Sequence, residues 1–270
     1  MRLGFSGLWV GLSSVGLMAC LADIPELTGA TGSTGVGGGA TTTAAATTGN
    51  GFCADQVADF CADFDGQGGV TNGWDFHHEG PDIHFELDAE KRVSEPNSGH
   101  IWVDPDAAVC TYAQLRKSVN EDASDPPFNF NFEFLAKITG IVAELNWGRG
   151  ATLCQVLVYV NDDNITLSLR EQSGMFDTGA SIDIPEPPYE EWHDLKIRID
   201  RATRGFVVQY DGMTPTVAVA MSAGPWLEAC ADADPEPGGR IDLGIGSYCV
   251  ATGSDESTDA YFDNVTFEFE

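Results

Sequence analysis

The chain has 270 residues, of which 42 are Asp or Glu and 13 are Lys or Arg, and its formal charge at pH 7 is −29. A charge of this size and sign makes nucleic acids and anionic membrane surfaces poor partners. Residues 51–270 are long enough to bury a sizeable core, and no second linker interrupts them, so we expect a single domain there.

The N-terminus has the pattern of an export signal. Arg2 precedes an uncharged apolar run, Leu3–Ala19, which is shorter than the roughly 20 residues that a membrane-spanning helix needs. The run ends in Leu17-Met18-Ala19-Cys20, which resembles the bacterial lipobox, where the signal is removed and the cysteine carries a lipid. We expect residues 1–19 to be a lipoprotein signal peptide and Cys20 to be the lipidation site. An ordinary signal peptide with a chance cysteine is the alternative.

Residues 20–50 join this anchor to the rest of the chain. Thr28–Asn50 consists almost entirely of Thr, Gly and Ala, which offer nothing large to bury, so we expect a flexible tether about 25 Å from end to end. The protein would then be exported and held in the bacterial cell envelope, at the outer membrane or cell surface. It would contact the membrane through the lipid anchor only.

Six cysteines are left once Cys20 is assigned to the lipid. An even number in an exported chain indicates disulfides, and no metal-ligand spacing is present. Fifteen pairings are open to six cysteines. We expect sequential pairing: Cys53–Cys61, Cys110–Cys154 and Cys230–Cys249.

From Phe128 onward, apolar and polar residues alternate as they do in β-strands. In "FNFNFEF" four phenylalanines share one face, and in "IVAELNW" we expect Ile141, Ala143, Leu145 and Trp147 to do so. "CQVLVYV" and "ITLSLR" flank the turn "NDDN", which predicts a hairpin.

The later segments continue this pattern. "LKIRID" and "FVVQYDG" form a second hairpin around "RATRG", followed by "RIDLGIGSYCV" and "AYFDNVTFEFE". Only Thr111–Val119 could be a helix, and it could equally be a strand. The sequence therefore predicts an all-β fold of two antiparallel sheets packed face to face, a jelly-roll sandwich stapled by disulfides.

Three sequence motifs resemble those of one particular superfamily of this fold. "FDG", "EWHDLKIRID…VVQYDG" and "YFDNVTFEF" resemble the concanavalin A-like lectin and glucanase superfamily, including laminin-G-like domains. The resemblance covers most of residues 60–270 and implies a curved jelly roll. In that superfamily the concave sheet often holds sugar-binding or active-site residues. It also implies core positions for Trp74 and Trp192.

The bacterial β-glucanases of this superfamily carry Glu-x-Asp-x-x-Glu. "SIDIPE" places Asp183 and Glu186 at its last two positions, but Ser181 stands where the nucleophile belongs. Retaining glycosidases need two carboxylates, so this motif is incomplete and we expect no glucanase mechanism. No complete catalytic motif of another kind is present.

A sugar-binding surface is the functional hypothesis that follows. Glu133 and Glu144 lie on the polar faces of strands expected to be neighbours, with Asn131 and Asn146 beside them, and Tyr159 and Arg170 could extend this surface. The alternative is that these side chains are simply the solvated face of the sheet. Trp102 and Trp226 lie in loop-like segments and are candidate aromatic platforms, while Trp147 alternates with the core residues.

The expected partner is therefore a polysaccharide or glycoconjugate bound without catalysis. A glycoside hydrolase or polysaccharide lyase acting through Glu133 and Glu144 is the second hypothesis. A structural or protein-interaction role is the third.

A structural Ca²⁺ is the one cofactor expected. The first and last strands of such jelly rolls often lie together, and the resemblance implies a Ca²⁺ there, with Asp63 or Asp65 and Asp263 as carboxylate ligands and backbone carbonyls as the rest. Turn and edge-strand aspartates are the alternative. "HHEGPDIH" lacks the spacing of a metal site and is expected to be a solvated loop.

Overall fold

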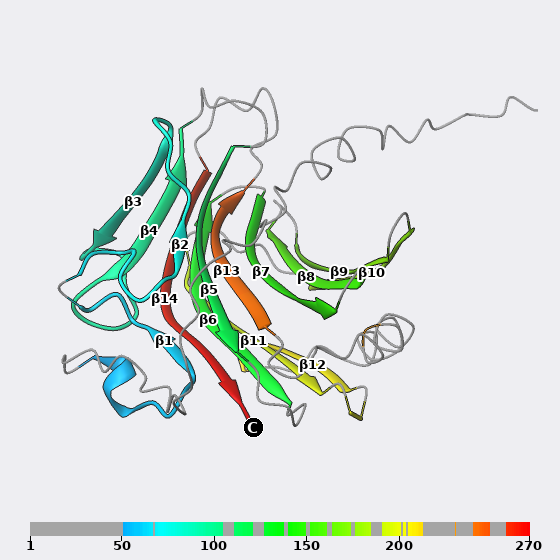
Figure 1. Ribbon diagram of the computed structural model, residues 1–270. Helices are drawn as coiled ribbons and strands as arrows, with labels where there is room; N and C mark the ends of the chain where they lie inside the picture. Colours follow the sequence, from blue (N-terminus) through cyan, green and yellow to red (C-terminus); the bar gives the residue numbers. More distant parts are fainter. Residues whose placement is uncertain are drawn as a thin grey trace, which may run out of the picture. The chain divides into compact units, whose positions relative to one another are not determined.

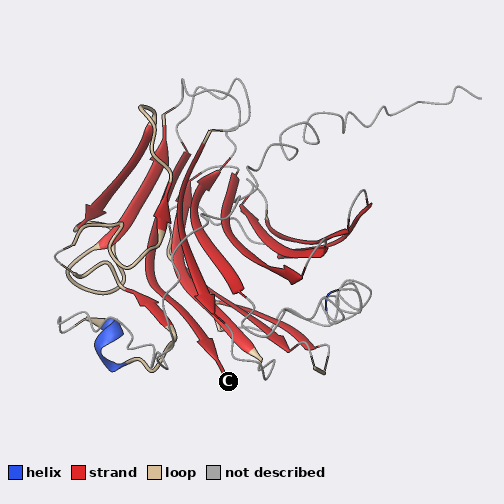
Figure 2. Ribbon diagram, in the orientation of Figure 1, coloured by secondary structure: helices blue, strands red, loops and turns tan. Residues whose placement is uncertain are grey.

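The computed structural model describes residues 51–270 apart from 67, 105–110, 121–126, 138–139, 150–151, 161–163, 174–175, 185–190, 201, 204, 213–229, 231–239 and 249–257. The described residues are mostly β-strands, preceded by a short 3-10 helix, η1 (Phe52–Asp55) (Figure 2). No helix in this part of the chain is long and apolar enough to cross a membrane. The predicted lipidation site Cys20 and the tether lie outside the described residues.

The strands form two antiparallel sheets of seven strands each, which we call sheet A and sheet B (Figure 1). Sheet A has the order β12 (Gly205–Tyr210), β11 (His193–Asp200), β6 (Phe128–Lys137), β14 (Thr258–Phe269), β4 (Ser98–Val103) and β3 (Ile83–Asp88), with β1 (Phe60–Ala62) paired to β14. Sheet B has the order β10 (Phe176–Ile184), β9 (Ile165–Ser173), β8 (Thr152–Val160), β7 (Gly140–Arg149), β13 (Arg240–Tyr248), β5 (Tyr112–Asn120) and β2 (Phe76–His77). The predicted two-sheet jelly roll is confirmed.

The core lies between the inner faces of the two sheets. Phe128, Phe130, Phe132 and Phe134 of β6 are fully buried, as the period of two predicts. Phe128 meets Trp147 of sheet B edge to face, at 5.7 Å between ring centroids. Burial of an aromatic side chain contributes about 1.5–3 kcal/mol, so this row of rings is a main source of cohesion between the sheets.

Both predicted hairpins form, with β8 paired to β9 and β11 paired to β12. Residues 111–119, which could have been helix or strand, belong mostly to β5. The predicted inward face of β7 is wrong at its first residue, Ile141, because the pairing of β7 with β8 has a bulge between Ile141 and Ala143. The extra residue reverses the alternation, so Val142 enters the core and Ile141 turns outward. Trp192 is only partly buried, not in the core as expected.

Two disulfides join described residues. Cys53–Cys61 forms as predicted and ties η1 to β1. Cys154 pairs with Cys230, so the sequential assignments of Cys110 to Cys154 and of Cys230 to Cys249 are wrong. Cys154 points into the core from β8 and is fully buried, so its partner is decided by the packing of the sandwich and not by sequence distance. Cys110 and Cys249 lie outside the described residues.

Candidate functional site

The outer face of sheet B carries a cluster of polar side chains on neighbouring strands. Because side chains alternate along a strand, the residues next to core positions point away from sheet A. On β5, β7 and β8 these are Gln114, Arg116, Glu144, Asn146 and Gln155, which we call the sheet B network. In Figure 1, β7–β10 bend along their length, with the hollow of the bend facing away from β11 and β12. The network therefore lies on the concave side of its sheet.

A buried carboxylate is the centre of this network. Glu144 is 4% exposed, and its Oε1 accepts a hydrogen bond from Gln114 Nε2 at 2.6 Å. The same oxygen forms an ion pair with the Arg116 guanidinium at 3.0 Å. Arg116 Nε also donates to Gln114 Oε1 at 2.6 Å, so the three side chains form a closed triangle. Each fixes the other two in position, which gives a site that is ordered before any ligand binds.

A glycine on the strand between them makes this triangle possible. Gly244 of β13 is the register partner of Arg116 on β5 and of Glu144 on β7. Since glycine has no side chain, the guanidinium can reach across β13 to the carboxylate. The sequence "DLGIG" thus opens the centre of the face where a larger residue would separate the two charges.

Electrostatics set the protonation of the central groups. Burial raises the pKa of Glu144, and the nearby Arg116, Gln114 and Asn146 oppose this only in part. Gln155 Nε2 donates to Asn146 Oδ1 at 2.8 Å, so the row continues onto β8. The face therefore offers amide groups that both donate and accept, together with the Arg116 guanidinium at its centre.

The edge of this face at β2 is partly open. Phe76, the register partner of Arg116, is 46% exposed. The backbone N–H of His78 donates to Gln114 O at 3.0 Å, and burial and the Arg116 charge lower the pKa of the His78 imidazole. His78 is thus held in its neutral form at pH 7 beside a fixed cation.

The expected pairing of Glu133 with Glu144 is wrong. β6 belongs to sheet A and β7 to sheet B, so consecutive strands place the two carboxylates on outer faces that point in opposite directions. Glu133 accepts from Asn264 Nδ2 at 2.6 Å, and Asn131 Nδ2 donates to Thr266 Oγ1 at 3.1 Å. These are contacts between neighbouring strands of sheet A, and they leave Glu144 and Asn146 as the predicted pair that lies in the network.

Two other predicted sugar contacts, Tyr159 and Arg170, also lie on the outer face of sheet B, while Trp102 does not extend this surface. Tyr159 packs against Ile141 and Leu157. Arg170 of β9 is the register partner of Gln155 and donates to Ser168 Oγ at 3.4 Å, so it borders the sheet B network. Trp102 is not an open platform, because His84 and His100 stack against its ring at centroid distances of 4.6 and 4.3 Å. Trp226 lies outside the described residues.

The incomplete glucanase motif lies on the last strand of sheet B. Ser181 and Asp183 belong to β10, and Glu186 lies outside the described residues. β10 is three strands away from β7 in the sheet, so the motif is not part of the sheet B network.

The predicted Ca²⁺ ligands do come together, with unequal fit. A β-carbon on Gly51 would lie 2.3 Å from Asp65 Oδ2 and 2.6 Å from Asp63 Oδ2, so the two carboxylates converge on the space beside this glycine. Asp65 Oδ2 is buried without a hydrogen-bond partner, and burial, with the charges of Asp63 and Asp263, raises the pKa of Asp65 to about 6. A cation would satisfy both carboxylates.

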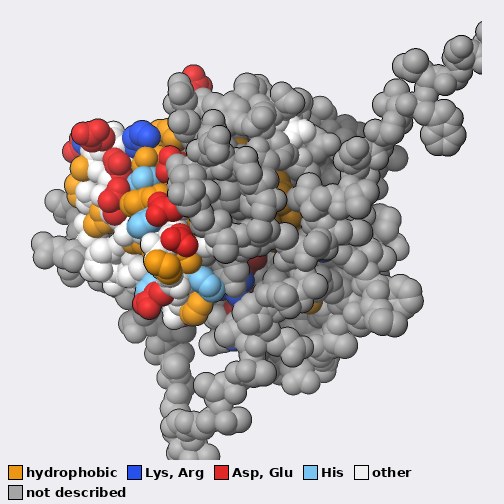
Figure 3. All heavy atoms as spheres, turned by 90° about the horizontal axis from the view of Figure 1, so that it is seen from above, with side chains coloured by type: hydrophobic (Ala, Val, Ile, Leu, Met, Phe, Trp, Pro, Cys, Tyr) orange, Lys and Arg blue, Asp and Glu red, His pale blue; other side chains and the backbone are white. Residues whose placement is uncertain are grey.

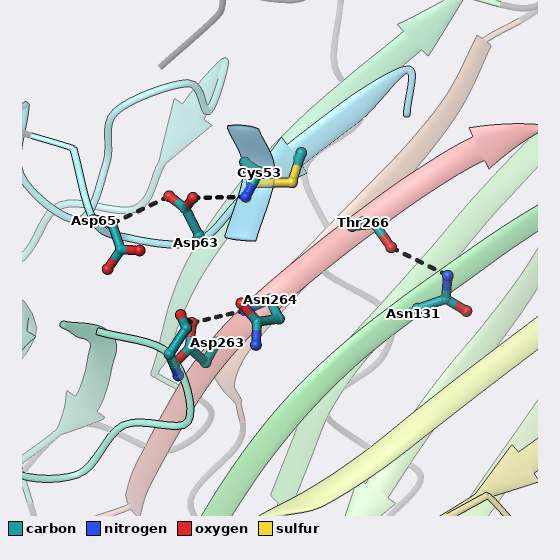
Figure 4. The surroundings of a disulfide bond; sticks show 9 residues. Cys53, Asp63, Asp65, Asn131, Asp263, Asn264 and Thr266 are labelled. Carbon is teal, nitrogen blue, oxygen red and sulfur yellow. Dashed lines mark hydrogen bonds between the residues drawn. A yellow bond between two sulfur atoms is a disulfide. The ribbon is translucent and has the colours of Figure 1, made fainter. Parts of the chain in front are cut away.

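Asp263 fits such a site less well. Its two oxygens accept from the backbone N–H groups of Val93, Ser94 and Asn264 and from Ser94 Oγ, at 2.8–2.9 Å. Its role is to fix the loop before β4, next to Asp63 and Asp65 (Figure 4). Among the described residues no group of three or more His, Cys, Asp or Glu is arranged to hold a metal ion, so backbone carbonyls and water would have to complete the site.

Sequence reasoning missed Gln114, Arg116, Gln155 and His78. The first two were hidden by the ambiguity of residues 111–119, because only a strand places Gln114 and Arg116 on one face. The alternation in "CQVLVYV" already pointed Gln155 outward. His78 could not be found from its loop-like segment, since its position depends on the pairing of β2 with β5.

The fold is similar to that of known polysaccharide lyases. An endo-β-1,4-glucuronan lyase from the fungus Trichoderma reesei aligns with a TM-score of 0.59 over 79% of this chain and 96% of its own, at 10% identity. A family 7 alginate lyase, A1-II′, in complex with product aligns with a TM-score of 0.50 over 72% of this chain and 85% of its own, at 12% identity. No family model and no curated protein sequence matches the chain. At these identities the similarity establishes the concanavalin A-like jelly roll and nothing finer.

Proposed function

We propose that the chain binds a polysaccharide along the concave outer face of sheet B. The observation that carries this is the pre-ordered triangle of Arg116, Gln114 and Glu144, which Asn146 and Gln155 extend across three strands. Amides suit sugar hydroxyls because they donate and accept, and the guanidinium suits a uronate carboxylate. The similarity in fold to two polysaccharide lyases supports a polysaccharide as the ligand.

A panel of glucuronan, alginate and a neutral β-glucan tests this proposal by affinity electrophoresis and calorimetry. We expect at least one polysaccharide to bind, and Arg116→Gln to weaken that binding by about tenfold or more. Arg198→Gln, on the outer face of sheet A, is the matched control and should leave binding unchanged. Absence of binding to the whole panel, or equal weakening by both variants, would contradict the proposal.

Lyase activity is the second candidate function. β-Elimination on a uronate requires a group that neutralises the carboxylate and a base that takes the adjacent C–H proton. The bond from the sugar ring to the glycosidic oxygen breaks as the double bond forms, and the departing oxygen takes a proton from water or from the protonated base. Arg116 would neutralise the carboxylate, and His78, whose pKa is lowered by burial and by the Arg116 charge, would take the proton. The fold, shared with lyases that act on glucuronan and alginate, supports this candidate.

Elimination creates a carbon–carbon double bond conjugated with the carboxylate, so product formation is followed by ultraviolet absorbance. A lyase would produce this signal with wild type and lose it with His78→Ala, while polysaccharide binding persists. Binding without any absorbance change would leave the protein as a non-catalytic binder.

We infer that Cys20 carries a lipid and that the domain is displayed from the bacterial envelope. The apolar run and the lipobox-like sequence before Cys20 support this. Cys20→Ser should move the protein from the membrane fraction to the soluble fraction. Unchanged membrane retention would contradict lipidation at this residue.

A Ca²⁺ ion beside Gly51 is also part of the proposal. Asp63 and Asp65 would hold it, and the ion would supply the charge that these converging carboxylates lack. Its role would be to fasten η1, the segment that follows the tether, to the domain.

A further inference from the structure

A pocket of about 500 Å³ lies at the edge of the sandwich where β2 meets β3 and β4. Its walls include three histidines, two glutamates and one tryptophan: His77, His78, His84, Glu79, Glu86 and Trp102. Figure 3 shows histidine, acidic and apolar side chains gathered on this side of the molecule. The volume is within the range of small-molecule sites. The pocket shares only His78 with the surroundings of the sheet B network.

One wall is the end of a column of stacked rings. Tyr261, His100, Trp102 and His84 stack in this order, with centroid separations of 4.1, 4.3 and 4.6 Å and interplanar angles of 5°, 20° and 15°. The column crosses from β14 over β4 to β3. His84, its last ring, lines the pocket and has a side chain that is 34% exposed. A ligand ring could continue the stack at His84.

Hydrogen bonds hold this wall in place. His100 has a carboxylate at each ring nitrogen, with Glu86 at 3.0 Å from Nδ1 and Asp259 at 3.1 Å from Nε2. Glu86 is thereby positioned at the pocket wall from the column side. A wall ordered in advance reduces the entropy that a ligand must lose on binding.

The charges around the pocket favour a cation. Lys and Arg are absent from its described lining, while Glu79 and Glu86 have side chains that are 82% and 55% exposed. Each of these glutamates contacts one histidine, Glu79 with His77 Nε2 at 3.1 Å and Glu86 with His100, and keeps its second carboxylate oxygen for a ligand. Asp104 lies 3.0 Å from His84 Nε2 and adds a third carboxylate nearby. Aromatic faces and carboxylates together are the surroundings in which ammonium groups bind. The sheet B network, with Arg116 at its centre, has the opposite preference.

We propose that this pocket is a second binding site and takes an amino sugar, with the ammonium group on Glu79 and Glu86 and the sugar ring against His84. The site is independent of polysaccharide binding on sheet B. It would bind a free amino sugar or an amino sugar unit at the end of a chain, since both present the same ammonium group and sugar ring.

Ligand-observed NMR titrations of the full chain at constant ionic strength test this, with glucosamine, glucose and glucuronate as probes. Glucosamine should bind at millimolar concentrations, about tenfold more tightly than glucose, and glucuronate should not bind. Equal affinity for glucosamine and glucose, preference for glucuronate, or no binding of glucosamine would each overturn the proposal.

Variants locate the binding. The double variant Glu79→Gln and Glu86→Gln should reduce glucosamine affinity by about tenfold. Glu95→Gln is the matched control, because Glu95 is 85% exposed and lies outside the pocket, and it should bind like wild type. Glu79→Gln alone alters only an exposed side chain, so a loss of affinity there cannot be attributed to misfolding. Equal losses in Glu95→Gln and in the double variant would contradict a site at these two glutamates.

Discussion

The outer faces of the two sheets each carry an arginine–glutamate pair, and the two pairs differ in burial. On sheet B, Arg116 and Glu144 have side chains that are 21% and 4% exposed and share Gln114 as a third partner. On sheet A, Arg198 and Glu270 are 35% and 39% exposed and form a two-pronged contact. The same residue types thus build an ordered, partly dehydrated site on one face and a solvated surface contact on the other. Burial, and not composition, distinguishes the candidate functional face.

The largest expected effect is on stability when each arginine is replaced by glutamine. Arg116→Gln leaves Glu144 buried without its cation, which should lower the free energy of unfolding at pH 7 by about 2–4 kcal/mol. Arg198→Gln removes a solvated pair and should cost less than about 1 kcal/mol. Urea unfolding of both variants under one buffer condition measures the difference. Equal losses would show that the two faces do not differ as their burial suggests.

The fold could be predicted from the sequence because apolar and polar residues alternate with a period of two along its strands. Phe128 to Phe134 alternate with polar residues, and the turn sequences between the hairpin strands are short and polar. The bulge before Ala143 and the Cys154–Cys230 pair could not be predicted in this way. The bulge is a local break in the pairing of β7 with β8, and the disulfide joins cysteines 76 positions apart, so a strict alternation of apolar and polar residues encodes neither.

The candidate site was predicted only in part, for the same reason. Alternation shows that Glu133 and Glu144 face away from the core, but it does not say which sheet each strand joins. The chain crosses from sheet A to sheet B between β6 and β7, and this separates them. Arg116 reaches Glu144 because β13, from the C-terminal part of the chain, inserts Gly244 between their strands. A contact assembled from three segments so far apart leaves no local signal.

A smaller effect is expected at the carboxylates beside Gly51, which have no cationic partner among the contacts described. Asp65 has a pKa of about 6 in the folded protein against 3.8 for an ordinary aspartate, so its ionised form disfavours folding at pH 7. Asp65→Asn should therefore raise the free energy of unfolding by about 1 kcal/mol in the presence of a chelator, a value reduced for partial solvent exposure. The gain should vanish below about pH 4, where both states of wild type are protonated.

Ca²⁺ should make wild type more stable than Asp65→Asn, the reverse of the order expected with a chelator, if the proposed ion binds. Millimolar Ca²⁺ should raise the melting temperature of wild type and leave that of Asp65→Asn unchanged. Asp88→Asn serves as a control, since Asp88 lies outside the carboxylate pair and accepts from the backbone of Glu90 and Lys91. An equal response of wild type and Asp65→Asn to Ca²⁺ would count against a site at these residues.

The smallest effect, and the one that separates the two faces most directly, is the pH dependence of their glutamates. Arg198 and Asn129 lower the pKa of Glu270 to about 2, so its contribution to stability is complete above its ordinary pKa of 4.5 and is lost as the pH falls toward 2. Solvent screening keeps this contribution below about 1 kcal/mol.

The pH dependence of Glu144 has the opposite sign. Burial raises the pKa of Glu144, so on acidification the folded state binds a proton at a higher pH than the unfolded state does, and a lower pH favours folding through this residue. The stability of wild type relative to Glu270→Gln should therefore fall between pH 5 and pH 2, while its stability relative to Glu144→Gln should rise as the pH is lowered toward the ordinary range of a glutamate. If the free energy of unfolding changes with pH in the same direction in the two comparisons, the Glu144 carboxylate is solvated like that of Glu270. That result would contradict a preformed site at the sheet B network.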